Sequence, residues 1–570
     1  MGTLYYGDNL PILLDHIKDE SVDLVYLDPP FKSDANYNAF FQGKSGASAS
    51  QIKAFEDTWH WVNKDNESMS EFQKMLGHAH TPDAVRKLLQ AYYDFMGGCD
   101  MMAYLMMMSP RLVELKRVLK PTGSLYLHCD PTASHYLKLL LDAIFGGQNF
   151  RNEITWKRSH AHSDSKQGRK GFGNVADIIL YYSKSEAYLF NTQYLEYSQE
   201  YIDKYYRYRD ADGRRYWLDN LTGPGGAAKG NPSYEVMGVT RHWRYSKERM
   251  QKLISEGRVI QTKPGNVPQY KRYLDEMPGV PLQNIWTDIS PINMMAKERL
   301  GYPTQKPVAL LERIINASSN PGDFVLDPFC GCGTTIDAAE KSGREWIGID
   351  ITQIAMTTIK KRLWDTYHET KTVKFLRGSD AATPDAQSKP SGTEMVVRII
   401  GEPATPEDAA AMAKDDPYGF QWWAAGLVGG QGGAEKKKGA DGGIDGRIIF
   451  YDDPKSANGE EIILQVKGGN LKADDVRALG FVVQREQAAM GVLISVDEPT
   501  DKMYADAAAA EYYTHKLTGK KYPKLQLRTV KELMEGKGIE RPSEHAARDE
   551  TFKKAPKAKA KGGEQTAMEL

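Results

Sequence analysis

The chain has 570 residues, 41% of them hydrophobic, so it can form more than one hydrophobic core, and disorder throughout is excluded. Its 74 Lys and Arg residues nearly balance 75 Asp and Glu residues, which excludes a histone-like binder held to polyanions by bulk charge. The 4 cysteines are too few for a disulfide framework, and the sequence has neither a signal-peptide pattern nor an apolar stretch of about 18 residues. We therefore expect a soluble, cytoplasmic protein that does not associate with membranes.

The first part of the chain alternates predicted strands with predicted helices. A buried strand over 22–28 ends at Pro29 and Pro30, which cannot donate hydrogen bonds to a sheet, so Asp28 is presented at the strand tip. Further strands and helices are predicted within 111–130, 135–145, 151–158 and 176–184. This alternation predicts an α/β fold with a mainly parallel sheet.

Residues 185–300 interrupt this alternation. Aromatic and basic side chains are interleaved in the stretch YIDKYYRYRDADGRRYW, and a glycine-rich stretch follows it. Such a mixture suits contact with DNA, because aromatic rings stack on bases and Arg and Lys pair with phosphates. A solvated helix face with buried aromatic rings explains any single one of these residues equally well.

A glycine-rich loop lies between two strands once the α/β alternation resumes after residue 302. Gly331 and Gly333 let the backbone approach a ligand closely, and Asp350 ends the second strand, where it can accept hydrogen bonds from ribose hydroxyls. Ile336 replaces the third glycine of the dinucleotide-binding pattern, which favours a nucleoside over a pyrophosphate ligand. Standing alone, the segment is explained equally well as a tight turn of any α/β domain.

Two motifs in combination are more specific than either alone. The F-x-G-x-G of Phe329 to Gly333 and the D-P-P-F of Asp28 to Phe31 resemble the cofactor and catalytic motifs of S-adenosylmethionine-dependent DNA amino-methyltransferases. Their order, catalytic motif first, resembles the permuted β group of that family. The resemblance covers about residues 1–375 and implies a Rossmann-like fold, a target-recognition region over 185–300, and double-stranded DNA as the substrate. It also implies these cofactor-binding residues: Asp8, Thr304, Lys306, Asp327, Phe329, Gly331, Gly333, Thr334 and Asp350.

The catalytic motif has a chemical rationale. The lone pair of an exocyclic amine is delocalised into the base, and acceptors beside its protons, the Asp28 carboxylate and the Pro29 carbonyl, localise that pair on a loop stiffened by Pro30. Phe31 can stack on a base that has left the duplex. By resemblance, aspartate at the first position favours adenine N6 and serine would favour cytosine N4, and both targets stay open. No Pro-Cys pair supplies the nucleophile that methylation at cytosine C5 needs.

Three other features have structural explanations. A cluster of methionines within 101–108 is predicted to pack in a core. Cys330 and Cys332 lack the partners of a zinc site, and His128 is predicted to be a satisfied structural histidine.

The composition changes near residue 381. Residues 381–393 form a predicted linker rich in Pro, Ser and Ala, and a second domain is predicted over 394–538. The basic tail over 539–570 is predicted to be disordered.

A hairpin within the second domain gathers a further set of polar residues. Alternation along its second strand puts Gln465 and Lys467 on one face, and Asp445 precedes its first strand. The arrangement resembles the Mrr-like branch of the PD-(D/E)xK nucleases, so the second domain is expected to be a smaller α/β, restriction-endonuclease-like fold. By that resemblance Asp445, Gln465 and Lys467 are catalytic, with Asp445 and Gln465 holding Mg²⁺.

Together the two resemblances predict an enzyme that methylates adenine N6 in double-stranded DNA, within restriction-modification, with Mg²⁺-dependent endonuclease activity in its second domain. The alternative is a cytosine-N4 methyltransferase whose nuclease-like domain is inactive and binds DNA. A DNA-binding regulator with two inactive domains and an RNA methyltransferase are further alternatives. Family analogy alone suggests a homodimer.

Overall fold

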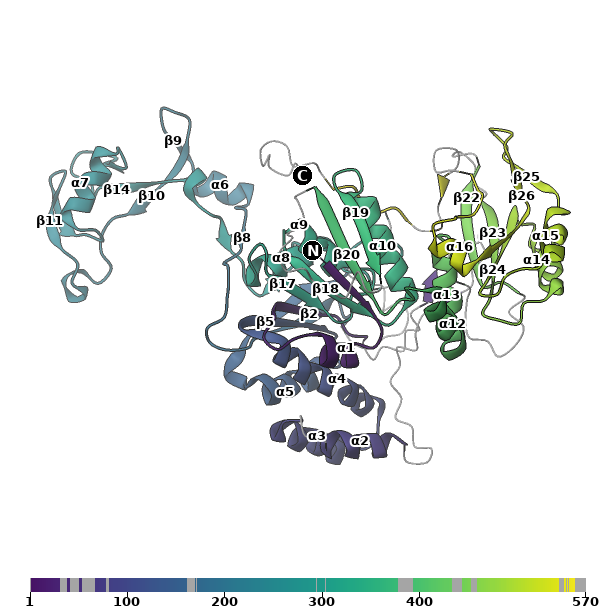
Figure 1. Ribbon diagram of the computed structural model, residues 1–570. Helices are drawn as coiled ribbons and strands as arrows, with labels where there is room; N and C mark the ends of the chain where they lie inside the picture. The colour runs from purple at the N-terminus through teal and green to yellow at the C-terminus, as the bar shows by residue number, and fades with distance from the viewer. Residues whose placement is uncertain are drawn as a thin grey trace. The chain divides into compact units, whose positions relative to one another are not determined.

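The computed structural model describes two compact units, Met1–Asn191 with Asn284–Leu570, and Thr192–Gln283, which we treat separately (Figure 1). The described residues are 2–30, 38–40, 51–53, 67–77, 81–160, 170, 172–293, 295–302, 304–377, 393–432, 443–452, 459–542, 548–549, 551 and 553–558. Phe31 lies outside them. No helix in these ranges is both long and apolar enough to cross a membrane.

A 10-stranded sheet forms the centre of the first unit, in the order β16-β6-β7-β5-β2-β17-β18-β1-β20-β19. Its strands are β1 (Gly2–Tyr6), β2 (Val22–Leu27), β5 (Leu119–Cys129), β6 (Phe150–Lys157), β7 (Ala176–Ser183), β16 (Ile285–Trp286), β17 (Phe324–Asp327), β18 (Glu345–Asp350), β19 (Thr372–Arg377) and β20 (Glu394–Ile400). Only β7 runs antiparallel to its neighbours in this sheet. The predicted α/β fold with a mainly parallel sheet is confirmed.

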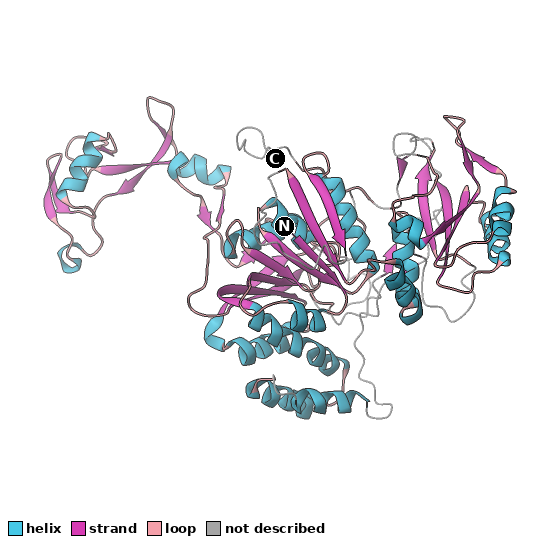
Figure 2. Ribbon diagram, viewed as in Figure 1, coloured by secondary structure: helices cyan, strands magenta, loops and turns pink. Residues whose placement is uncertain are grey.

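Helices cover both faces of this sheet (Figure 2). They are α1 (Asn9–His16), α4 (Asp100–Val118), α5 (Ser134–Phe145), α8 (Val308–Ser318), α9 (Thr334–Lys341) and α10 (Gln353–Tyr367). Two further helices, α2 (Glu67–Gly77) and α3 (Asp83–Met96), pack on α4 and α5 and not on the sheet. All six residues of β2 are buried, as expected for a central strand covered on both sides. Met102 and Met108 of α4 are fully buried in the main core, so the prediction that the methionines pack in a core is confirmed. A short pair of strands, β3 (Asn38–Phe40) and β4 (Gln51–Lys53), is separate from the sheet.

Residues 394–400, which we predicted to be the start of the second domain, form strand β20 of the first sheet. β20 pairs in parallel with β1 on one side and with β19 on the other. Its residues alternate between buried and half-buried, a pattern that identifies a strand but not the sheet that it joins. The boundary at residue 394, placed by linker composition, is therefore wrong by the length of this strand.

The second domain contains a smaller sheet with helices on both faces. The sheet has the order β21-β22-β23-β24-β27, and β28 pairs with β22. Its strands are β21 (Gln431–Gly432), β22 (Gly446–Tyr451), β23 (Glu460–Lys467), β24 (Met490–Ser495), β27 (Leu525–Thr529) and β28 (Arg548–Asp549), and a hairpin of β25 (Tyr512–Thr514) and β26 (Lys521–Pro523) lies apart. The helices are α12 (Pro406–Asp415), α13 (Pro417–Leu427), α14 (Ala473–Arg485), α15 (Asp501–Ala508) and α16 (Val530–Met534). β22 and β23 form the predicted antiparallel pair.

Part of the tail that we predicted to be disordered is ordered. Thr551 is buried, and its hydroxyl accepts a hydrogen bond from the Ile449 amide at 2.9 Å. Ala555 is also buried, and the Ala558 amide donates to the Thr366 carbonyl of α10 at 2.8 Å. Composition alone missed these contacts, because small and basic residues carry no periodic pattern that marks a packing face.

The second unit, Thr192–Gln283, corresponds to the interrupting segment of the sequence. Its elements are β8 (Tyr194–Leu195), α6 (Gln199–Tyr205), β9 (Tyr208–Arg209), β10 (Arg215–Asn220), β11 (Ser233–Val236), β12 (Val239–His242), α7 (Lys247–Ser255), β13 (Val259–Ile260), β14 (Gln269–Tyr273) and β15 (Val280–Pro281). A small core of its own, centred on the fully buried Trp243, holds it together. The unit is narrower than the predicted range 185–300.

Candidate active site

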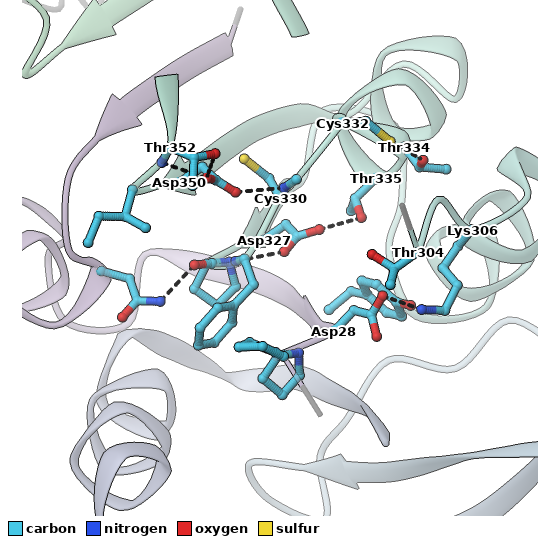
Figure 3. Close-up of a pocket in the computed structure, with 18 of the residues that line it drawn as sticks. Asp28, Thr304, Lys306, Asp327, Cys330, Cys332, Thr334, Thr335, Asp350 and Thr352 are labelled. Carbon is cyan, nitrogen blue, oxygen red and sulfur yellow. Dashed lines mark hydrogen bonds and ion pairs between the residues drawn. The ribbon is translucent and has the colours of Figure 1, made fainter. Parts of the chain in front are cut away.

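Three acidic residues meet at the carboxyl ends of three neighbouring strands. β2, β17 and β18 are parallel and adjacent; Asp28 follows the first, and Asp327 and Asp350 end the other two. All three line one cavity of about 230 Å³ (Figure 3). Ligands of open α/β sheets bind at this edge. Two motifs far apart in the sequence therefore converge on one pocket.

Most of the catalytic and cofactor-binding residues that we predicted in the methyltransferase part of the chain line this pocket. They are Asp8, Asp28, Pro29, Pro30, Thr304, Lys306, Asp327, Phe329, Gly331, Thr334 and Asp350. Gly333 does not line it. Its φ of 75° places it at the N-terminus of α9, and a Cβ there would lie 2.8 Å from Ile359 Cγ1, so this glycine serves helix packing. Asn9 also lines the pocket, as do Tyr26 and Arg111, which sequence reasoning missed.

The glycine loop and Asp350 hold one another in place. The Gly331 amide donates to Asp350 Oδ2 at 2.9 Å, and the amide and hydroxyl of Thr352 donate to Oδ1 at 2.9 and 2.7 Å. Gly331 has a φ of 48°, and a Cβ on it would lie 3.3 Å from the Tyr302 ring. Burial raises the pKa of the Asp350 carboxyl. A bare backbone beside a fixed carboxylate fits the ribose of a nucleoside cofactor.

Asp327 orders the loop that follows its strand. Its carboxylate accepts a hydrogen bond from the Thr335 hydroxyl at 2.5 Å and another from the Phe329 amide at 3.0 Å. Burial, together with the nearby charges of Asp28 and Asp350, raises the pKa of Asp327 to about 7. Both carboxylate oxygens of Asp327 therefore already accept hydrogen bonds from other residues of the chain.

A guanidinium from α4 anchors the N-terminal part of the pocket. Arg111 Nη2 donates to Asp8 Oδ1 at 2.8 Å, and its Nε donates to Asn9 Oδ1 at 2.6 Å. Asn9 in turn donates to the Pro328 carbonyl at 2.8 Å, which ties this loop to the one after β17. No sequence signal marks Arg111, since a basic residue on an amphipathic helix is ordinary.

Lys306 contacts the catalytic motif. Its ammonium group donates a hydrogen bond to Asp28 Oδ2, and the dashed line between the two side chains is visible in Figure 3. Both side chains are mostly buried, with exposed fractions of 11% and 16%. Both residues line the pocket, and the ammonium lies at its Asp28 end.

A buried polar chain lies beneath the pocket. His128 is fully buried; its Nδ1 lies 2.9 Å from the Tyr26 hydroxyl and its Nε2 lies 3.0 Å from Asp177 Oδ2. Tyr26 itself lines the pocket. The prediction of a satisfied structural histidine is confirmed, and the chain fixes the ring of Tyr26 in the pocket wall.

The three residues of the second-domain motif are neighbours at one end of β22 and β23. The Asp445 amide donates to the Leu464 carbonyl at 2.9 Å, and Asp445 Oδ2 accepts from the Val466 amide at 2.7 Å. Lys467 forms an ion pair with Asp475 at 3.0 Å. Gln465 is buried, and its Oε1 has no hydrogen-bond partner within the described part of the chain. An unpaired buried carbonyl oxygen leaves room for a donor or a cation.

No cluster of three or more His, Cys, Asp or Glu side chains that could hold a metal ion occurs among the described residues. A divalent cation at the second-domain motif would have one carboxylate and one amide from this strand pair. Cys330 and Cys332 are buried free thiols.

Several basic residues of the second unit are engaged within the unit. Arg214 pairs with Asp275 and Glu276, and Arg215 pairs with Asp203. Arg207 and Arg209 are exposed, and no ion pair to either occurs within the described ranges. The exposed guanidinium groups available for phosphates are thus fewer than the sequence indicates.

The comparisons with known proteins agree with the site. A family model described as DNA methylase (N6_N4_Mtase) matches residues 22–361, more than half of the chain. The chain belongs to this DNA methylase family. A second model, described as NACHT-associated inactive Restriction Endonuclease 1, matches residues 427–535 of the second domain.

Three relatives illustrate the range of the similarity. The chain is 35% identical over 263 residues to the Type II methyltransferase M.EcaI of Enterobacter cloacae, covering 46% of this chain and 57% of that one. It is 29% identical over 350 residues to the Type III restriction-modification enzyme StyLTI Mod subunit of Salmonella typhimurium, covering 58% and 48%. It is 56% identical over 68 residues to the DNA adenine methyltransferase YhdJ of Escherichia coli, covering 12% and 23%. The chain thus spans about half the length of the first two relatives.

Proposed function

We propose that this protein transfers a methyl group from S-adenosylmethionine to adenine N6 in double-stranded DNA. One observation carries the proposal: the Asp28 carboxylate and the glycine loop that begins at Phe329 line the same pocket as Asp350. Membership of the DNA methylase family supports it. When bound, S-adenosylmethionine supplies a methyl group on a positively charged sulfur.

The residues of the pocket divide between the two substrates. Asp350, beside Gly331, accepts hydrogen bonds from the ribose of the cofactor, and Asp8 lies at the end of the pocket proposed for its adenine. Asp28 and the Pro29 carbonyl accept hydrogen bonds from the target amine, which localises the nitrogen lone pair. The Asp28 carboxylate then takes the proton that the nitrogen releases on methylation. The target base leaves the duplex to enter the pocket, at a cost of a few kcal/mol.

The choice of adenine over cytosine rests on the aspartate that opens the catalytic motif. The segment of similarity to a DNA adenine methyltransferase supports this choice. Cytosine N4 is the alternative, because the same two acceptors suit either amine. Membership of the permuted β group and a role in restriction-modification are part of the proposal, and the Type II and Type III names of the relatives support the latter.

The role of Asp28 can be tested by transfer of tritiated methyl groups to plasmid DNA. We expect Asp28→Ala to lower transfer by at least about a thousandfold, while calorimetric binding of S-adenosylmethionine stays within about threefold of wild type. Asp15→Ala, on the exposed side of α1, is the matched control and should keep full activity. Wild-type transfer in Asp28→Ala would refute the proposed role.

A specific observation supports a second activity. Among the described residues, the buried Oε1 of Gln465 has no hydrogen-bond partner, and the Asp445 carboxylate contacts the amide of the following residue, Val466. Lys467 stands two residues further on the same strand. We propose that the second domain binds Mg²⁺ there and cuts DNA phosphodiesters. The family model that matches this domain is described as inactive. The alternative outcome is therefore a domain that binds DNA without cutting it.

Nicking of unmethylated plasmid decides between these outcomes. We expect wild-type protein to nick with Mg²⁺ and not with EDTA, and Lys467→Ala to lose nicking, whereas Lys502→Ala, an exposed lysine of α15, should retain it. Wild-type protein that leaves DNA of every methylation state intact overturns the nuclease proposal and leaves the methyltransferase proposal untouched.

A further inference from the structure

We propose that Lys306 positions the Asp28 carboxylate for the target amine and is not a ligand of the cofactor's carboxylate. The proposal rests on the proposed methyl transfer at Asp28. It replaces the cofactor-binding role that sequence resemblance implies for this lysine with a role in the chemical step.

Lys306 and Asp28 are in direct contact. Lys306 Nζ donates to Asp28 Oδ2 across 278 positions of sequence, and both side chains are largely withdrawn from water. A charge-assisted hydrogen bond in a partly buried site is stronger than an exposed ion pair. It engages Oδ2 and fixes the plane of the carboxylate, which leaves Oδ1 to accept the N–H of the amine.

Hydrogen bonds on both sides hold the loop that carries Lys306. The side chain of Gln305 accepts from the Leu300 amide at 2.8 Å and donates to the Glu298 carbonyl at 2.6 Å. The Glu298 carboxylate accepts from the Val308 amide at 3.0 Å. Thr304 adopts a φ of 60°, a strained conformation for a residue with a side chain. Strain held by such bracing is typical of a side chain that must be aimed.

The charges around the pocket also favour a role for Lys306 at Asp28. Asp28, Asp327 and Asp350 line one pocket, and Lys306 compensates the first of them. A lysine at this place repels the positive sulfur of S-adenosylmethionine, so its removal should strengthen binding of that cation relative to a neutral analogue. A lysine that bound the carboxylate of the methionine moiety would have a different signature. Its loss would weaken S-adenosylmethionine and S-adenosylhomocysteine alike, because both carry that carboxylate and only the former carries the positive sulfur.

Calorimetry with these two ligands separates the two roles. We expect Lys306→Met to raise the affinity ratio of S-adenosylmethionine to S-adenosylhomocysteine by about threefold to tenfold, and kcat at saturating cofactor and DNA to fall by about a hundredfold or more. Lys306→Arg, which keeps the charge and the donors, should recover part of kcat and the wild-type ratio. Lys297→Met, an exposed lysine nearby, should match wild type in both measurements.

Two results would overturn the proposal. One is an unchanged affinity ratio with both ligands weakened by the same factor of about ten or more, which would make Lys306 a cofactor ligand. The other is a kcat that stays at the wild-type value in Lys306→Met. Binding of S-adenosylhomocysteine reports that the variant is folded, and Lys306→Gln replaces the methionine variant where it is not. A wild-type protein that transfers no methyl group fails the proposed function, but the affinity ratio still tests the charge argument.

Discussion

The pocket at β2, β17 and β18 and the strand pair β22–β23 differ in how their charged groups are supported. In the pocket, Asp327 and Asp350 accept hydrogen bonds from neighbouring loops and Asp28 accepts one from Lys306. In the strand pair, Asp445 is the one carboxylate of its motif, and the buried Oε1 of Gln465 has no partner within the described residues. The ends of several adjacent parallel strands can therefore bring several acidic side chains together and give each a hydrogen-bond donor. The end of a single hairpin offers few acidic side chains.

Among the substitutions that test this difference, removal of the Asp350 side chain should have the largest effect, on the affinity for S-adenosylmethionine. Asp350→Ala takes away the proposed ribose acceptor and the anchor of both Gly331 and Thr352, so we expect the affinity for S-adenosylmethionine to fall by about a hundredfold. Calorimetry measures the loss. Glu345→Ala, at the other end of β18, is the control, and an effect of similar size there would mean that the strand rather than the carboxylate matters.

The pH dependence of stability tests whether the buried Asp327 carboxyl has a raised pKa. Because burial raises its pKa to about 7 from 3.8, the folded state keeps a proton that the unfolded state has released at intermediate pH. This contribution to stability is complete below the unfolded value and is lost as the pH rises through about 7. Between about pH 4 and 7, the free energy of unfolding should fall by about 2 to 4 kcal/mol more in wild type than in Asp327→Asn. Denaturant titrations that give both proteins the same pH slope would contradict the assignment.

A second carboxylate at the end of β23 should strengthen the binding of Mg²⁺ there. Gln465→Glu places a negative charge beside Asp445, and we expect Mg²⁺ affinity to rise by about tenfold in a calorimetric titration. Gln484→Glu near the end of α14 adds the same charge elsewhere and should leave the affinity unchanged. No change in Gln465→Glu would show that the end of β23 does not bind the cation.

The smallest effect is expected at the second unit. Replacing the exposed Arg207 and Arg209 together by alanine removes two groups proposed to pair with phosphates. DNA affinity should fall several-fold, and the slope of log affinity against log salt should decrease in magnitude by about 2. The ion-paired Arg214 and Arg215 supply the control pair, for which the salt slope should change less.

The ends of two strands were predictable from the sequence, because a buried apolar run before Pro29 and another before Gly331 mark where these strands stop. The convergence of Asp28 with Asp350 follows, since neighbouring parallel strands end at one edge. Arg111 and Tyr26 were not predictable, because their roles depend on which distant groups their side chains reach. The roles assigned to the individual site residues stay predictions.

The predictions that failed concern contacts that leave no distinctive pattern in the sequence. β20 has the same alternating pattern in either sheet, so its pairing with β1 could not be read from composition. The tail around Thr551 packs through single hydrogen bonds and small side chains, which leave no periodic signal. Gly333 stays a predicted cofactor residue, although it does not line the pocket and its positive φ suits the start of α9.

The central claim is that Asp28 and the glycine loop act together on the amino group of an extruded adenine. Mass spectrometry of nucleosides from DNA incubated with wild-type protein and S-adenosylmethionine tests it most directly. We expect N6-methyldeoxyadenosine to form with wild-type protein and with Asp15→Ala, and not with Asp28→Ala. N4-methyldeoxycytidine as the product, or N6-methyldeoxyadenosine formed equally well by Asp28→Ala, would contradict it.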